Sequence, residues 1–280
     1  MAASINTNYA AMLAAQNLNR TTAVLGEVQT RISTGLKVAS AKDNGAVYGI
    51  ALRQQATSQS LNAVRESLQR AQSVTDVSLA AGETITDLLV QMKEKALASI
   101  DTTINAPERL ILNADFTALR TQINTAANNS GFNGASLISS TATAIRALAD
   151  DTGGRTISVG RQWLFTPSTA TTDSNVRVRT TSTIGNVVAA SASLSLVNES
   201  IQRVAIALAA IGTGSKALLN HTNFINKLQD AVDAGVGNII DADMAKEASR
   251  LQSTQAKQQL GFQALAIANQ GPSNLLGLFR

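Results

Sequence analysis

Residues 5–33, INTNYAAMLAAQNLNRTTAVLGEVQTRIS, and residues 239–270, IIDADMAKEASRLQSTQAKQQLGFQALAIANQ, decide the fold of this 280-residue chain. In both stretches, apolar and small residues recur at alternating steps of three and four, which places them on one face of a helix. The predicted seams are Ala11, Ala14, Leu18, Thr21, Leu25, Val28 and Ile32 in the first stretch, and Met244, Ala248, Leu251, Gln255, Gln258, Phe262 and Leu265 in the second.

Neither terminal helix carries enough large apolar side chains to be stable alone. Alanine, threonine and glutamine fill seam positions at which a stable two-stranded coiled coil would carry leucine, isoleucine or valine. An isolated helix with one sparse seam is marginal in water. We therefore expect both helices to be disordered in the free monomer and to fold on each other and on further copies of the chain.

The chain between these stretches predicts three more helices, over residues 46–99, 107–127 and 186–232. The first and third contain apolar residues at heptad spacing, and the second contains four apolar residues on its predicted buried face. The positions are Leu61, Val64, Leu68, Ala71, Ile85, Leu89, Met92 and Ala96 in the first, Leu110, Phe116, Leu119 and Ile123 in the second, and Leu194, Val197, Ile201, Val204, Leu208, Ile211, Leu218 and Ile225 in the third. Gly235 and Gly237 predict a break before the last helix, and Gly271–Pro272 predicts its end.

Residues 137–184 differ in composition, with many Thr, Ser, Gly and Arg residues. Thr156–Val159 and Val176–Arg179 alternate apolar and polar residues, which is the period of a β-strand. The predicted fold class is therefore mainly α: a long antiparallel helical bundle formed by the N- and C-terminal segments, with a small β-rich segment in mid-sequence. The predicted domains are a terminal helical domain (1–45 with 235–280), a helical shell domain (46–136 with 185–234) and the β-rich segment (137–184).

Composition limits the possible functions. The chain has no cysteine, which excludes disulfides and cysteine-based zinc sites. Its net charge of +4 comes without a basic run or interleaved aromatics, so the sequence gives little support for nucleic-acid binding. We expect no membrane partner, because the longest apolar stretch, Val204 to Ile211, is far shorter than the roughly 20 residues of a membrane span. No cleavable signal peptide is visible, so an extracellular location requires another export route.

No constellation of residues predicts catalysis, a cofactor or a metal ion. Asp241, Asp243 and Glu247 could be taken for a metal cluster, but carboxylates at the start of a helix more commonly cap its amides and complement its dipole. His221 is the single histidine and has no nucleophile at a suggestive spacing. The sequence therefore predicts a protein that is not an enzyme.

Several motifs together resemble bacterial flagellin, in its short alphaproteobacterial form, over essentially the whole chain. They are SINTN at 4–8, RISTGLK at 31–37, SAKDN at 40–44, DADMAKE at 241–247, QQLG at 258–261 and LFR at 278–280. The joint motif between the first two helices includes Arg31, Ser33, Gly35, Lys42, Asp43 and Asn44. The residues expected to make subunit contacts are Leu18, Leu25, Val28, Ile32, Met244, Leu251, Phe262, Leu265, Leu278, Phe279 and Arg280.

The resemblance implies a structural subunit that self-assembles into the extracellular flagellar filament for swimming. It also implies unfolded export through the flagellar type III apparatus, without a cofactor. The implied partners are further copies of the chain, other flagellins, hook-associated and cap proteins, and the export apparatus with its chaperone. Two alternatives stay open: a hook–filament junction protein, which shares the terminal helices, and a non-flagellar helical scaffold or adaptor.

Overall fold

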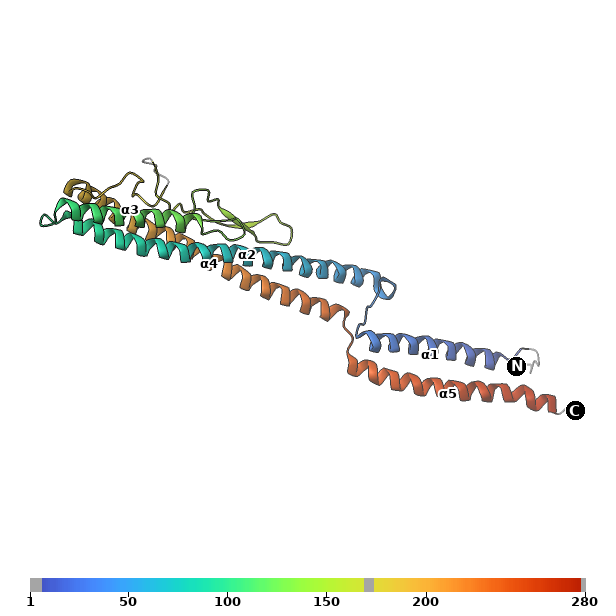
Figure 1. Cartoon of the computed structure of the whole chain (residues 1–280). Coiled ribbons are helices and arrows are strands. Elements are labelled where there is room, and N and C mark those ends of the chain that lie inside the picture. The colour runs from blue at the N-terminus through green and yellow to red at the C-terminus, as the bar shows by residue number, and fades with distance from the viewer. Residues whose placement is uncertain (1–6, 169–173, 278–280) are drawn as a thin grey trace. The chain divides into compact units, whose positions relative to one another are not determined.

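The computed structural model describes residues 7–168 and 174–277, and in this part of the chain five helices and one two-stranded sheet are formed (Figure 1). The elements are α1 (Tyr9–Thr34), α2 (Ala41–Ile100), α3 (Ala106–Asn128), β1 (Ile145–Leu148), β2 (Thr156–Val159), α4 (Val187–Ile240) and α5 (Met244–Gly277). Contacts divide the chain into two units: residues 1–58 with 230–280, called the terminal unit, and residues 59–229, called the central unit. The predicted mainly α fold with a small β-rich segment is confirmed.

The core of the central unit follows the heptad predicted for α2. All eight predicted seam residues, from Leu61 to Ala96, are buried. Between the two apolar blocks the same three- and four-residue steps continue through Thr75, Ser78 and Gly82, which are also buried. One unbroken stripe therefore runs along this part of α2, with small residues where other segments approach.

The α4 seam has the predicted register. Val197, Val204 and Ile211 are fully buried, whereas Leu194 and Ile201 are partly buried. The intervening buried positions carry small side chains: Ser193, Ser200, Ala207 and Ser215. Polar contacts that join α4 to α2 include those from Gln72 Nε2 to Ser215 Oγ at 2.7 Å and from Gln229 Nε2 to Asn62 Oδ1 at 3.2 Å.

The length and composition of α4 would also permit a membrane span, since one 18-residue window has a mean hydropathy of 1.3. It is the one helix of the described chain that meets this test, and the sequence prediction had found no candidate. Val197, Val204 and Ile211 of α4 are packed in the core of the central unit, whereas Val188 and Ile206 on the same helix are exposed, and 28% of the window is buried.

The start of α3 is fixed by its sequence. Asn105 and Glu108 form a capping box, with Glu108 N donating to Asn105 Oδ1 at 2.9 Å and Asn105 N donating to Glu108 Oε2 at 3.1 Å. Phe116, Leu119 and Ile123 are buried as predicted. Leu110 is exposed instead, and its neighbour Arg109 is buried, donating to the carbonyls of Ser99 in the last turn of α2 and of Asp101 and Ile104 beyond it.

The β-rich segment contains one antiparallel hairpin. β2 matches the predicted strand, and it pairs with β1, which the alternation analysis missed. The predicted strand Val176–Arg179 is wrong: Val176 and Val178 are buried, but the Arg177 amide donates to Ser200 Oγ on α4 at 2.7 Å instead of to a strand.

Side chains on the helices hold the backbone of this segment. The Leu137 amide donates to Ser78 Oγ, the Leu148 amide to Ser67 Oγ at 3.1 Å, and the Ile184 amide to Asn113 Oδ1 at 2.8 Å. These bonds satisfy backbone groups that lack a sheet partner. The small polar residues on the helices therefore position a segment with little secondary structure of its own.

Two predicted helix boundaries are wrong. Gly235 and Gly237 lie inside α4, which continues to Ile240, so the break falls at residues 241–243. Likewise α5 passes through Gly271 and Pro272 to Gly277. A glycine in a helix interior costs only about 1 kcal/mol relative to alanine, and the long α4 tolerates this at Gly235 and Gly237.

Candidate assembly site: the terminal helix pair and its joint

The first and last helices lie side by side and antiparallel in the terminal unit (Figure 1). Asn8 caps α1 by accepting from the Ala11 amide at 3.0 Å, and its Nδ2 donates to the Ala268 carbonyl on α5 at 2.7 Å. Further along, Gln258 Nε2 donates to Thr22 Oγ1. We call α1 and α5 together the terminal helix pair.

The α1 seam has the predicted register. Val28 is fully buried, and the other six predicted positions are partly buried, including Leu18, Leu25 and Ile32. This stripe faces α5, as shown at Leu18, whose side chain lies against Gly261.

The predicted α5 seam is wrong at alternate positions. Leu251, Gln258 and Leu265 are partly buried as expected, but Met244 is 45% exposed and Phe262 is 56% exposed. The stripe against α1 shares Leu251, Gln258 and Leu265 with the predicted seam, and its other positions carry smaller or charged side chains: Glu247, Thr254, Gly261 and Ala268. A β-carbon added at Gly261 would lie 3.1 Å from Leu18 Cδ1, so glycine allows the helices to come this close.

The terminal helix pair buries few side chains. Within Tyr9–Thr34 and residues 244–270, the buried residues are Val28, Glu247 and Thr254, and one of these three is apolar. Large apolar side chains instead lie exposed along both helices. They are Tyr9, Met12 and Leu13 on α1, and Met244, Leu260, Phe262 and Ile267 on α5.

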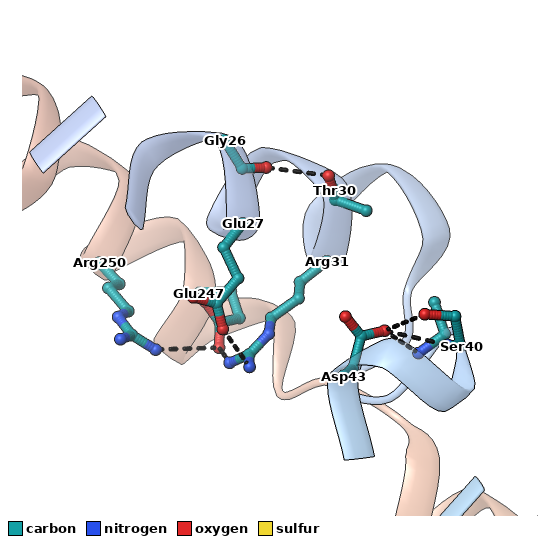
Figure 2. Close-up of polar contacts among 9 residues, drawn as sticks. Gly26, Glu27, Thr30, Arg31, Ser40, Asp43, Glu247 and Arg250 are labelled. Atoms are coloured by element: carbon teal, nitrogen blue, oxygen red, sulfur yellow. Dashed lines mark hydrogen bonds and ion pairs between the residues drawn. The ribbon is translucent and has the colours of Figure 1, made fainter. Parts of the chain in front are cut away.

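A charged cluster links the two helices near the joint (Figure 2). Arg31 on α1 lies 2.5 Å from Glu27 Oε1 and 3.3 Å from Glu247 Oε1 on α5. The Glu247 side chain is 8% exposed, and Arg250 Nη1 lies 3.9 Å from the same oxygen. Arg31 therefore neutralises a carboxylate that is nearly removed from water.

Gly35 ends α1 in the left-handed conformation, with φ 72° and ψ 2°, and its amide donates to the Arg31 carbonyl at 2.9 Å. Glycine adopts this conformation without the steric cost that other residues pay. The next residues run antiparallel to the segment between α4 and α5: Ala242 N donates to Gly35 O at 2.8 Å, and Lys37 N donates to Ile240 O at 2.6 Å.

The joint continues into α2 through two successive caps. Asp43 Oδ2 accepts from the Ser40 amide at 2.9 Å and from the Ser40 hydroxyl at 3.1 Å (Figure 2). The hydrogen bonds from Ser40 hold the pKa of the Asp43 carboxyl below its ordinary value. Asn44 is non-helical and accepts from the Val47 amide at 3.1 Å, so a second cap starts the long helix.

The remaining predicted residues divide into two sets. Ser33 and Lys42 of the joint motif are exposed. Leu278, Phe279 and Arg280 lie outside the described residues. Asp243 caps α5 as expected, accepting from the Lys246 amide at 3.1 Å.

No group of three or more metal-ligating side chains occurs among residues 7–168 and 174–277. His221 contacts the Ala149 carbonyl at 2.8 Å through Nε2 and packs beside Phe224, so it supports the β hairpin. The terminal unit is marked by exposed apolar side chains, one nearly buried ion pair and a capped joint, which are features suited to contacts between proteins.

Comparisons with known proteins place this architecture in a class and then in a family. The fold is that of a class of long helical proteins: it superposes with a TM-score of 0.53 on a Vibrio parahaemolyticus protein described as flagellar hook-associated, at 14% identity, covering 71% of this chain and 100% of the other. Models of the bacterial flagellin N-terminal and C-terminal helical regions match residues 5–143 and 194–279.

Whole-chain relatives agree with these matches. The chain is 50% identical to flagellin FljK of Caulobacter vibrioides, covering 99% of this chain and 98% of the relative, and 29% identical to a flagellin of Brucella melitensis, covering 99% of both. The chain belongs to the bacterial flagellin family. The resemblance first seen in the joint and terminal motifs is thereby confirmed.

Proposed function

We propose that this chain is a structural subunit of the bacterial flagellar filament and that it self-assembles through its terminal helix pair. The observation that carries the proposal is the low burial in that pair. Val28 is its one buried apolar residue among the positions whose exposure the structure describes, although α1 has 26 residues and α5 has 34. Helices of this length need tertiary packing for stability, and further copies of the chain can supply it.

The exposed apolar residues identify the surfaces that other copies would cover. Phe262 and Met244, which the sequence assigned to the α1–α5 seam, lie outside it and are free to pack between subunits. Leu18, Leu25, Val28, Ile32, Leu251 and Leu265 hold the pair itself together. We propose that Leu278, Phe279 and Arg280 complete the subunit contacts.

The capped joint is proposed to connect the inner and outer parts of the subunit. Residues 1–45 with 235–280 would form the inner domain of the filament, residues 46–136 with 185–234 the shell around it, and residues 137–184 a small β-rich segment against or outside that shell. Caps at Gly35, Asp43 and Asn44 together with the backbone bonds to Ile240 make this connection short and defined.

The proposal places the working protein outside the cell, after unfolded export through the flagellar type III apparatus. A terminal pair that is unstable in the monomer suits this route, because little structure must be unfolded there. Partners would be further copies, other flagellins, hook-associated and cap proteins, and the export apparatus with its chaperone. The described residues offer no reason to assign an enzymatic role.

Electron microscopy of negatively stained protein tests the proposal. Purified protein is depolymerised by heat, returned to neutral pH, and supplied with salt and filament seeds. We expect long filaments of uniform width from the full chain and none after deletion of residues 1–33 or 239–280. Short capped oligomers would instead favour the hook–filament junction protein, and persistent monomers a helical scaffold or adaptor.

A further inference from the structure

Beyond Glu27 on α1 and Glu247 on α5, toward the two chain ends, the terminal helix pair carries charge of one sign. From Tyr9 to Gly26 the single charged residue is Arg20, and between residues 248 and 277 the charged residues are Arg250 and Lys257. A solvated helix surface normally mixes both signs. Neither range contains an acidic residue, so their charge comes from three cations.

All three cations line one groove between α1 and α5. Its walls also carry the hydroxyl groups of Thr21, Ser253 and Thr254. Thr254 is 5% exposed, so the floor of the groove is closed by packing. Among the described residues, neither Arg20 nor Lys257 takes part in an ion pair, and Arg250 approaches Glu247 only at 3.9 Å, an oxygen that Arg31 contacts more closely.

Arg20 and Lys257 form no ion pair in the described chain, and Arg250 has a carboxylate only at 3.9 Å, so these like charges repel one another and favour an anionic partner. Hydroxyl groups beside them can donate further hydrogen bonds to a carboxylate. A groove of this kind fits acidic side chains better than an apolar segment.

The same unit carries an unmatched acidic pair. Asp230 and Asp233 lie one turn apart near the end of α4, and both are exposed. They do not line the groove, and neither forms an ion pair in the described part of the chain. Residues at this spacing share a helix face, so they present two carboxylates together.

We propose that the groove lined by Arg20, Arg250 and Lys257 receives the Asp230–Asp233 pair of a second copy of this chain. This inference rests on the proposed filament function and names a specific contact within it. Because groove and acidic pair are different surfaces, the contact is head-to-tail, and repetition of such a contact produces an open helical polymer rather than a closed dimer.

Charge reversal tests the contact in the full chain. Lys257→Glu or Asp233→Lys alone is expected to raise the critical concentration for seeded polymerisation at least tenfold, and the combined Lys257→Glu/Asp233→Lys chain to return to within about threefold of the unaltered chain, because the pair is restored with opposite polarity. Arg53→Glu, an exposed cation of the same unit outside the groove, is the matched control and should change it little.

A chemical cross-link tests the contact without any substitution. Carbodiimide joins an amine to a nearby carboxylate as an amide, with loss of water. In filaments grown from mixed ¹⁵N-labelled and unlabelled chains, Lys257 should link to Asp230 or Asp233 of a differently labelled chain. The Lys95–Asp115 pair, at 2.9 Å, is the positive control for reactivity.

The outcomes separate the inference from the function on which it rests. Filaments that form normally from both single variants, or a combined variant without recovery, would overturn the contact and leave filament formation standing. A Lys257 that links solely to other acids would do the same. Failure of the unaltered chain to polymerise at all would overturn both proposals.

Discussion

Gly214 on α4 lies where β2 packs, and its replacement by alanine should destabilise the central unit. A β-carbon there would stand 2.7 Å from Val159 Cγ1 and 2.9 Å from Cγ2. Val159 is 4% exposed, so its side chain has little room to move. Overpacking of this kind costs about 1–3 kcal/mol, against a gain of about 1 kcal/mol for replacing glycine in a helix.

Gly212 is the matched control, because it lies on the same helix two residues earlier and an added β-carbon meets nothing within 4 Å. Gly212→Ala should stabilise the unit by about 1 kcal/mol. Taking a net loss of about 1 kcal/mol for Gly214→Ala, the two variants differ by about 2 kcal/mol, or about 4–8 °C in Tm for a unit of this size.

The assay is thermal and urea unfolding of the monomer, followed by far-ultraviolet circular dichroism. Adding Val159→Ala to Gly214→Ala removes both close methyl groups, so the double variant should be more stable than the sum of the single changes by about 1 kcal/mol. Equal stability of Gly212→Ala and Gly214→Ala would refute the close packing of Val159 against Gly214.

Three further predictions concern the terminal unit. Gly26→Ala should stabilise the terminal helix pair in the filament by up to about 1 kcal/mol, since an added β-carbon meets nothing within 4 Å, whereas Gly261→Ala should gain less because of the 3.1 Å contact with Leu18 on α1. The critical concentration for seeded polymerisation compares the two variants, and a larger gain at Gly261 would argue against the observed pairing. Arg31→Met should weaken the filament by about 1–3 kcal/mol, because it leaves the nearly buried Glu247 carboxylate without its cation. The double variant Arg31→Met/Glu247→Met should recover most of the change in critical concentration. If it does not, loss of the ion pair is not the cause of the weakening. Because the pKa of Asp43 is lowered in the folded state, its hydrogen bonds stabilise the joint at pH values above the ordinary carboxyl pKa, and this stabilisation is lost as pH falls through the lower folded pKa. A carbon-detected NMR titration should therefore find the midpoint of Asp43 below 3.8. A midpoint at or above 3.8 would contradict the cap.

The buried face of a helix could be predicted from sequence where only one register buries its large apolar side chains. In α2, Leu61 to Ala96 permit a single stripe, and the structure uses it. The α1 seam was found for the same reason. The start of α3 could also be predicted, because Asn105, Pro107 and Glu108 each favour the same first turn.

The α5 seam could not be predicted because two stripes share Leu251, Gln258 and Leu265. Apolar content favoured the stripe with Met244 and Phe262, but close approach to α1 selects the one with Thr254, Gly261 and Ala268, whose side chains are smaller. That preference depends on the partner helix, which spacing within α5 does not encode.

The middle segment was the least predictable part. Val176–Arg179 alternates as a strand does, yet its backbone bonds to a serine on α4, and the short strand β1 is defined only by its pairing with β2. Serines on α2 and α4 were the missed signal, since a buried helix seam that repeatedly carries Ser requires partners for those hydroxyl groups.

Residue-resolved amide hydrogen exchange, measured on the same preparation as monomer and as filament, tests most directly whether the terminal helix pair folds by assembly. The account predicts exchange near the unfolded rate for Tyr9–Thr34 and for residues 244–270 in the monomer, strong protection of both in the filament, and protection of the core of the central unit in both states. Protection of the terminal helices in the monomer equal to that in the filament would contradict it.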